Sequence, residues 1–369
     1  MIRGLGLATL GAAGVVGVGV RRAFGASRRR IAAVATGSPQ YRDGAFHNAE
    51  PSRTLVGADA PDVIRALLTD RELRRPVVPV PLQRPDFPTG AGDLAITWLG
   101  HASALIEVDG YRVLADPVFG ERVSPSGLAG PRRLFPSPVS AQELPPLDAI
   151  LISHDHYDHL DLPTVKRLIT GQRCPFVVPI GVGAHLRTWG VPAGRVIELD
   201  WHGTHRIGDL ELVCTPARHF SGRGFRRDLT LWSSWAVRGP VHRVFFGGDT
   251  GYSTVFADIG HRYGPFDVTL LPIGAYSPSW PDIHLDPEQA WQVHQDVRGR
   301  LFVPIHWATF DLAPHPWAEP VTRLLAAAGP AAPVVVPRPG QRFDPRRPPS
   351  EQWWLRPGEP APAPLPQLT

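Results

Sequence analysis

The segment SHDHYDH at residues 153–159 contains three histidines and two aspartates. It follows an apolar run at residues 149–152 that has the composition of a buried strand. Side chains alternate as a chain leaves a strand, so His154, His156 and Asp158 can project to one side while His159 turns back from the loop. Imidazole nitrogen and carboxylate oxygen suit zinc and related divalent ions. The spacing HxHxDH therefore predicts a metal-binding loop.

Three later residues also follow predicted strands. His219 comes after the strand pattern at 210–215, Asp249 after 241–246, and His306 after 301–304. Each alone would be a structural polar residue, but beside the HxHxDH loop they complete a set of seven potential ligands. Seven ligands are sufficient for two ions if one carboxylate is shared between them. Two ions that share a water lower its pKa and neutralise a phosphate oxygen, which is chemistry for hydrolysis.

Other catalytic and metal-binding arrangements find little support in the sequence. The two cysteines, Cys174 and Cys214, are forty residues apart and belong to no CxxC pair, so neither a disulfide framework nor a thiolate zinc cluster is available. No GxSxG segment occurs, which disfavours a serine hydrolase. A polar turn with surface histidines is the structural alternative to the metal loop.

The elements that must position these side chains are short strands with helices between them. The chain has 42 prolines and 37 glycines among 369 residues, which disfavours a helix bundle or coiled coil. Strand patterns occur at 94–98, 104–108, 112–115, 149–152, 176–178, 196–199, 210–215, 232–237, 241–246, 268–271, 301–304 and 334–336. Helix patterns occur near 61–68, after Asp161, and at 254–261, 287–296 and 317–328. We expect an α/β protein of α+β type, with two mostly antiparallel sheets and helices on their outer faces.

The amino terminus carries a membrane-like signal. Residues 4–20 are uncharged and are flanked by Arg3 and by the pair Arg21 and Arg22, a length just within the range of a bilayer span. By the positive-inside rule these arginines would hold the following domain on the cytoplasmic side. A cleaved signal followed by export is the alternative. We expect residues 1–30 to form an apolar, arginine-rich membrane anchor or signal-like segment.

Composition divides the rest of the chain into three parts. We expect an extension at residues 31–92, the catalytic domain at 93–340 and a proline-rich tail at 341–369, in which Trp353 and Trp354 would dock onto the body. Residues 1–30 carry six arginines and no acidic residue, which leaves 32 basic and 34 acidic residues elsewhere. The body therefore lacks the basic excess that a nucleic-acid groove requires, and we expect no nucleic-acid partner.

Seven segments resemble the metallo-β-lactamase fold, and within it the group of N-acylphosphatidylethanolamine-hydrolysing phospholipases D and their bacterial relatives. The resemblance runs from about residue 42 to residue 340. The segments are TWLGHASALIEVDGYRVLADPVF, ILISHDHYDHLD, CTPARHFSGR, FFGGDTGY, LPIGAYSPSW, HLDPEQA and PIHWATF. The resemblance implies an αββα sandwich and two Zn²⁺ ions, with Mn²⁺ or Fe²⁺ as alternatives.

The resemblance also distributes the ligands and adds supporting residues. It implies a first metal held by His154, His156 and His219, a second held by Asp158, His159 and His306, and a bridge by Asp249. Asp158 would be a ligand and a proton acceptor. Asp116 matches a motif aspartate that would orient a ligand histidine, and a structural turn before Pro117 is its alternative. His284 would donate a hydrogen bond to phosphate or protonate the leaving oxygen, and entry into the following helix is its alternative.

The resemblance leads to a phosphodiesterase of phospholipase D type that acts on N-acylphosphatidylethanolamine-like phospholipids. The alternative is a metal-dependent hydrolase of a soluble substrate such as a sugar-phosphate lactone, a cyclic nucleotide or another small phosphodiester. A metal-stabilised binding protein is a third reading. The relatives also imply a homodimer.

Arg223 is close to His219 in the sequence and could contact a phosphate. His101 is expected to organise a strand turn below the metals.

Overall fold

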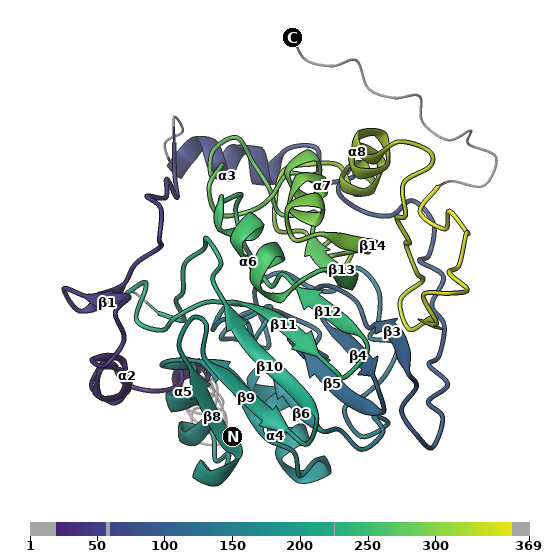
Figure 1. Cartoon of the computed structure of the whole chain (residues 1–369). Helices are drawn as coiled ribbons and strands as arrows, with labels where there is room; N and C mark the ends of the chain where they lie inside the picture. The colour runs from purple at the N-terminus through teal and green to yellow at the C-terminus, as the bar shows by residue number, and fades with distance from the viewer. Residues whose placement is uncertain (1–19, 57–59, 225, 356–369) are drawn as a thin grey trace, which may run out of the picture.

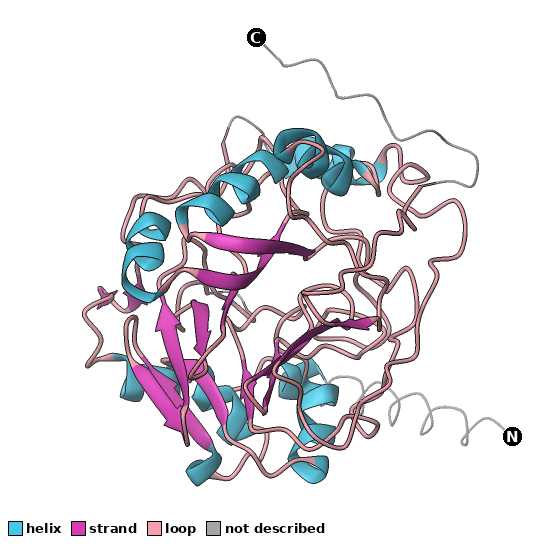
Figure 2. Ribbon diagram, turned by 45° about the vertical axis from the view of Figure 1, so that its right-hand side comes forward, coloured by secondary structure: helices cyan, strands magenta, loops and turns pink. Residues whose placement is uncertain are grey.

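Two facing sheets with helices on their outer sides form the body of the protein (Figures 1 and 2). The computed structural model describes residues 20–56, 60–224 and 226–355. Seven strands form one sheet, in the spatial order β15 (Arg342–Phe343), β3 (Leu94–Trp98), β4 (Ala104–Val108), β5 (Tyr111–Ala115), β6 (Ala149–Leu151), β7 (Phe176–Pro179) and β8 (Val196–Leu199). Six form the other, in the order β14 (Gly299–Ile305), β13 (Phe266–Pro272), β12 (Arg243–Phe246), β11 (Ser234–Arg238), β10 (Leu210–Thr215) and β9 (Thr204–Ile207).

The helices cover the outer faces of these sheets and confirm the αββα sandwich. On the six-stranded side lie α6 (Val255–Tyr263), α7 (Pro287–Asp296) and α8 (Glu319–Ala328), and on the seven-stranded side lie α4 (Leu162–Gly171) and α5 (Val182–Thr188). Before the sandwich come α2 (Arg28–Ala35), the hairpin β1 (Tyr41–Arg42) and β2 (Ala45–Phe46), and α3 (Ala60–Leu68). A short 3₁₀ turn, Ala193–Arg195, precedes β8.

Local sequence signals explain several boundaries. Asp109 and Gly110 both adopt positive φ (46° and 86°) and turn β4 into β5, as an Asp-Gly hairpin requires. Asp161 caps α4 by accepting a hydrogen bond from the Thr164 amide at 3.1 Å. Asp286 forms a capping box with Gln289 at the start of α7. These caps fix the helices that follow the two loops nearest to the predicted metal site.

Strand alternation divides the core into two apolar layers. In β4, Ala104 and Ile106 face the other sheet and join the larger cluster of buried side chains, whereas Leu105 faces α4 and α5. Burial on both faces explains why β3 to β6 are almost continuously apolar. The site loops therefore leave a rigid, fully buried framework.

Some expected elements differ from the structure. Both sheets are mixed: β9 to β12 and β15 to β5 pair antiparallel, whereas β12 to β14 and β5 to β8 pair parallel. Antiparallel pairs are the majority, six of the eleven pairings in these two sheets, as predicted, and the helical crossovers α4 and α7 connect parallel neighbours. The expected strand at 334–336 is only a single bridge between Val334 and Phe302. Helices α2 and α5, the hairpin of β1 and β2, and strands β9 and β15 were not expected.

The structure describes part of each end of the chain. Beyond residue 340, β15 pairs with β3, and Trp353 and Trp354 are buried against the core. At the other end, the apolar run at residues 4–20 lies outside the described residues except for Val20. No helix within the described ranges is long and apolar enough to cross a bilayer.

We predict that Trp353→Ala destabilises the fold by about 3–5 kcal/mol, because a large buried ring is lost. The indole packs against Trp307 with a ring-centroid distance of 5.4 Å and donates a hydrogen bond to the Val336 carbonyl at 3.1 Å. Urea unfolding of purified protein measures the change. Leu128→Ala, at a side chain that is 74% exposed, is the control and should change stability by less than about 0.5 kcal/mol. A loss below about 1 kcal/mol for Trp353→Ala would contradict the packing.

Candidate metal centre

The HxHxDH segment forms a tight loop at the carboxyl end of β6. Asp116, directly after β5, accepts hydrogen bonds from the Ser153 amide (2.6 Å) and the Ser153 hydroxyl (2.5 Å), which fixes the point where the loop begins. Further along, the His159 and Leu160 amides both donate to the His156 carbonyl, at 3.1 and 2.8 Å. The backbone is thereby closed into a turn that collects the polar side chains on one side.

A first donor set consists of His154, His156 and His219. Nδ1 of His156 lies 2.8 Å from Nε2 of His154 and 3.3 Å from Nε2 of His219. In His154 and His219 the other ring nitrogen, Nδ1, has a hydrogen-bond partner. Nδ1 of His154 lies 2.9 Å from the Ser153 hydroxyl, and Nδ1 of His219 lies 2.7 Å from the Ile283 carbonyl. Since that carbonyl only accepts, His219 carries its proton on Nδ1 and presents a free Nε2 lone pair.

A second donor set consists of Asp158, His159 and His306. Oδ2 of Asp158 lies 3.5 Å from Nε2 of His159 and 3.3 Å from Nε2 of His306. Nδ1 of His159 donates to Asp116 at 2.7 Å, which orients the ring and leaves Nε2 free. Asp116 is therefore placed behind His159, where it supports the donor set without facing it.

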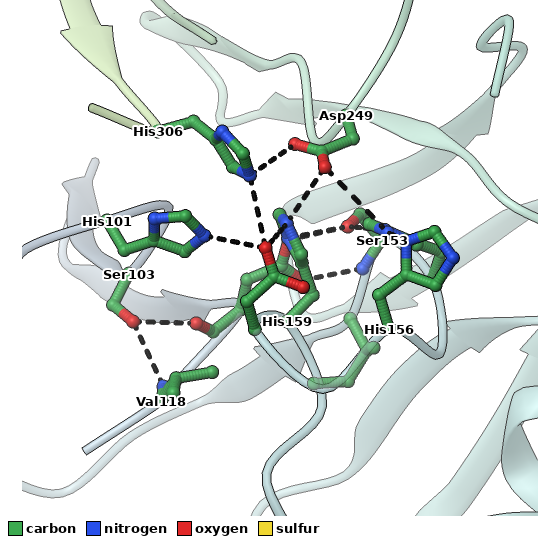
Figure 3. Close-up of polar contacts among 12 residues, drawn as sticks. His101, Ser103, Val118, Ser153, His156, His159, Asp249 and His306 are labelled. Carbon is green, nitrogen blue, oxygen red and sulfur yellow. Dashed lines mark hydrogen bonds and ion pairs between the residues drawn. The ribbon is translucent and has the colours of Figure 1, made fainter. Parts of the chain in front are cut away.

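Asp249 contacts both sets (Figure 3). Its Oδ1 is 3.1 Å from Nε2 of His306, and its Oδ2 is 3.1 Å from Nε2 of His159. The same Oδ2 lies 3.9 Å from Nε2 of His154 and 3.8 Å from Nε2 of His219. The structure thus brings together all seven side chains that the sequence proposed as ligands, with the Asp249 carboxylate between the two sets.

The spacing of these atoms fits divalent metal ions. Ligand atoms about 2.0–2.1 Å from a tetrahedral zinc ion lie about 3.3–3.4 Å from one another. The separations of 3.1–3.5 Å in the second set are close to this value, and the first set spans 2.8–3.9 Å. Several inward-facing atoms are buried and have no hydrogen-bond partner among the described residues, namely Nε2 of His159, Nε2 of His306 and Oδ1 of Asp249. Unpaired buried atoms of this kind are costly unless an ion satisfies them.

The charges of the two sets are different. Burial holds the pKa values of His154 and His219 well below the usual value, so both rings are neutral and can act as ligands. Burial also opposes ionisation of Asp158 and Asp249, but neighbouring imidazoles, His159 above all, keep the pKa of both carboxyls well below its usual range. Burial lowers the pKa of His306, but Asp249 outweighs it and raises that pKa to about 9. Metal binding at the second set would therefore release protons.

His101 contributes more than the expected strand turn. Its amide donates to the Thr309 hydroxyl at 2.6 Å, and its carbonyl accepts from the His306 amide at 2.9 Å. Its ring is buried, with a pKa lowered to about 3 chiefly by burial, and Nε2 lies 2.9 Å from Oδ2 of Asp158. A neutral ring donates a hydrogen bond there, so His101 positions Asp158. The GHAS segment indicated a turn but not the direction of this side chain.

His284 lies at the edge of the site, and its side chain is 14% exposed. Its Nδ1 is 3.9 Å from Oδ2 of Asp249, and Asp249, His284 and His306 form a third group with donor atoms within 4.8 Å of one another. Burial lowers the pKa of His284 to about 4, so the ring is neutral at pH 7. It is suited to donating or accepting a hydrogen bond rather than to storing a proton.

Arg223 does not face the metal site, contrary to the expectation from sequence. Its guanidinium is buried and donates to the backbone carbonyls of Ala23, Asp155 and Leu160. Its position four residues after His219 carries no information on side-chain direction, and the polypeptide around it provides three acceptors. Arg223 is therefore a structural residue of the loop base.

Comparison with known proteins gives relatives across most of the chain. The Beta-lactamase superfamily domain matches residues 111–307. An uncharacterized protein of Mycobacterium bovis is 54% identical over 344 residues, which cover 91% of this chain and 92% of the relative. A Caenorhabditis elegans protein named N-acyl-phosphatidylethanolamine-hydrolyzing phospholipase D 1 is 39% identical over 239 residues, which cover 62% of this chain and 67% of the relative.

Solved structures show the same fold. A metallo hydrolase from the archaeon Ignicoccus hospitalis superimposes with a TM-score of 0.53 at 23% identity, over 68% of this chain and 98% of the other. At that identity the likeness concerns the fold alone.

We predict that the wild-type chain binds two zinc ions, and that Asp249→Ala binds at most one per chain and loses hydrolytic activity, because the two donor sets lose their shared carboxylate. Elemental analysis after dialysis against zinc measures the stoichiometry, and circular dichroism checks the fold. Asp209→Asn, at an exposed position on the turn between β9 and β10, is the matched control and should keep two ions. Retention of two ions and full activity by Asp249→Ala would refute the shared-ligand assignment.

Proposed function

The chain belongs to the metallo-β-lactamase superfamily as a metal-dependent hydrolase, and from this premise we propose that it is a dinuclear zinc phosphodiesterase of phospholipase D type. Its proposed substrates are N-acylphosphatidylethanolamine-like phospholipids. The observation that carries the dinuclear part is the Asp249 carboxylate, whose two oxygens face His306 and His159 while Oδ2 also faces the first donor set.

The proposed chemistry divides between the ions and the chain. Two zinc ions, when bound, supply an activated water for attack on phosphorus and neutralise charge on a phosphate oxygen. Asp116 and the Ile283 carbonyl hold His159 and His219 in the required tautomers. Oδ2 of Asp158 is occupied by His101, whereas Oδ1 makes no hydrogen bond among the described residues, so it is the oxygen we assign as a proton acceptor.

His284 is the group that we assign to the substrate phosphate. It is the one neutral histidine at the site that keeps both partial exposure and a buried Nδ1 without a hydrogen-bond partner in the described part of the chain. A neutral imidazole at this edge can donate to a phosphate oxygen as charge develops there. We prefer this role to protonation of the leaving oxygen.

A large groove formed in part by α3 supports an elongated amphiphilic substrate. The groove has a volume of about 1070 Å³ and is lined by apolar residues of α3 and of the 119–137 loop, including Leu67, Phe119 and Phe135. Five arginines also line it, against Glu121 and Asp311: Arg71, Arg75, Arg122, Arg132 and Arg133. An apolar wall with a positive excess suits an acyl chain attached to an anionic phosphate.

The groove shares one wall residue, Asp311, with a second, smaller space. This space is a small cavity of about 20 Å³ whose wall includes His306 and Phe310. The phenyl ring of Phe310 lies 5.0 Å from the His101 ring, edge on. We propose that a lipid in the groove approaches the second donor set from the Phe310 side.

We further propose that residues 1–30 attach the protein to the cytoplasmic face of a membrane. Five arginines near its carboxyl end are exposed, namely Arg21, Arg22, Arg28, Arg29 and Arg30. Next to an anionic leaflet each would contribute roughly 1 kcal/mol.

We predict that zinc-loaded protein releases phosphatidate and an N-acylethanolamine from N-acylphosphatidylethanolamine vesicles, measured by mass spectrometry. Chelation should abolish the reaction and added zinc should restore it. Bis-p-nitrophenyl phosphate is the parallel soluble substrate. Turnover of this diester with no reaction on any phospholipid would reject the lipid proposal in favour of a small soluble phosphodiester.

We predict that His284→Ala lowers kcat by about 10²-fold while two zinc ions remain bound, because a donor to the developing phosphate charge is lost. His261→Ala, at an exposed position on α6, is the matched control and should leave kcat unchanged. Steady-state kinetics and elemental analysis are measured on the same preparations. Loss of one zinc ion in His284→Ala would show instead that His284 is a ligand.

A further inference from the structure

Asp155 stands between the ligands His154 and His156 but points away from them. Its side chain is buried: Oδ1 accepts from the Gly222 amide at 2.7 Å, and Oδ2 lies 3.3 Å from Nε2 of His185. Gly222 belongs to the loop that carries His219. The Asp155 carboxylate therefore links helix α5 to both loops that supply the first donor set.

Arg223 strengthens the same connection from the neighbouring position. Its Nη1 donates to the carbonyls of Asp155 (2.6 Å) and Leu160 (2.7 Å), one within and one just after the HxHxDH loop. Its guanidinium lies between two rings, 4.1 Å from the centroid of Tyr157 and 4.9 Å from that of Trp189. The hydroxyl of Tyr157 donates back to the Arg223 carbonyl at 2.6 Å.

The amino-terminal arm, which we define as residues 21–35, docks onto this buried cluster. The Ala23 carbonyl accepts from Nε of Arg223 at 3.0 Å, the Ala26 amide donates to Nδ1 of His185 at 2.9 Å, and the Arg22 carbonyl accepts from the Trp189 indole at 2.8 Å. Helix α2 of the arm lies beside α5 (Figure 1). Among the described residues, the arm thus supplies the hydrogen-bond partners of the Arg223 Nε, the His185 Nδ1 and the Trp189 indole.

Burying a carboxylate and a guanidinium seldom adds net stability compared with apolar packing, and in some proteins such groups instead fix one arrangement of the chain. None of these groups belongs to the metal donor sets. We propose that the docked arm, acting through His185, Arg223 and Asp155, positions the two loops that hold the first metal, and that Asp155 is a positioning residue of the site. This inference concerns metal binding directly, and it rests on the proposed function only where turnover is measured.

The arm follows the apolar run at residues 4–20 without a break in the sequence. In this proposal, the hydrogen bonds of the arm would relay a contact at that run to the HxHxDH loop. We call the contacts between the arm, His185, Arg223 and Asp155 the clamp. The clamp would couple the proposed membrane attachment to the metal centre.

Gly25→Ala tests the clamp from the side of the arm. Gly25 has φ +78°, and a Cβ there would overlap the His185 imidazole. Gly37→Ala is the matched control, because a Cβ at Gly37 meets nothing within 4 Å. We expect Gly25→Ala in the full chain to increase hydrogen exchange of residues 20–35 and to weaken zinc affinity, measured by chelator competition, about tenfold or more. Gly37→Ala should change neither.

Asp155→Ala and Asp155→Asn test the clamp from the side of the loop. Asp155→Ala should weaken zinc affinity 10- to 100-fold, and Asp155→Asn should recover most of this loss because its amide oxygen still accepts from Gly222. In Asp155→Ala, turnover of bis-p-nitrophenyl phosphate should be closer to the wild-type rate at saturating zinc than at limiting zinc.

Three outcomes would overturn the proposal. Gly25→Ala could leave hydrogen exchange at residues 20–35 unchanged, or it could raise that exchange while zinc affinity stays at the wild-type value. The third is wild-type zinc affinity in Asp155→Ala. A failure of the proposed function is distinguishable, because it would appear as normal zinc binding in the wild-type chain without turnover of any phosphodiester.

Discussion

The structure depends on the convergence of two carboxylates and a ring of imidazoles in a gap that is almost closed to water. Asp249 is 1% exposed at its side chain, and His159 and His306 are fully buried. Carboxylates in such a place are stable only when positive charge faces them. Without a cation the protons on His159 and His306 supply that charge, as the raised pKa values of both rings indicate. Divalent ions would replace these protons, and the site chemistry follows from that exchange.

The fold meets this constraint by ending several strands at one edge of the sandwich. Asp116 and His306 are the first residues after β5 and β14, and the HxHxDH loop follows β6. Because the strands are buried on both faces, their ends cannot shift without opening an apolar core. Polar groups behind the ligands complete the arrangement, since Asp116 and the Ile283 carbonyl each fix the tautomer of one ring. Precision in the site therefore derives from rigid strands and from hydrogen bonds on the sides of these rings that face away from the donor sets.

The sequence could predict whatever is encoded in local patterns. The HxHxDH spacing, the Asp161 cap and the apolar runs located the loop, α4 and the central strands because each depends on neighbouring residues. The edge strand β9 was not predicted, because its residues are only partly buried and alternate without an apolar face. Strand β15 was not predicted, because its two residues become a strand only by pairing with β3. The directions of His101 and Arg223 escaped for a related reason. Each side chain is oriented by a partner more than fifty residues away, Asp158 for His101 and Ala23 for Arg223.

Asp155 and Tyr157, which lie between the ligands of the motif, hold the loop in place from its other side. Alternation along the loop sends His154 and His156 toward the donor set and sends Asp155 and Tyr157 to the opposite side. There both meet Arg223, Asp155 through its carbonyl and Tyr157 through its ring and hydroxyl. The motif is thus a two-sided element, with one side that binds ions and another that is anchored in the protein. A loop that carried only ligands would have to be held in place by the ions themselves. Anchoring the reverse side lets the polypeptide set the ligand positions before a metal arrives, which reduces the ordering that binding must otherwise achieve.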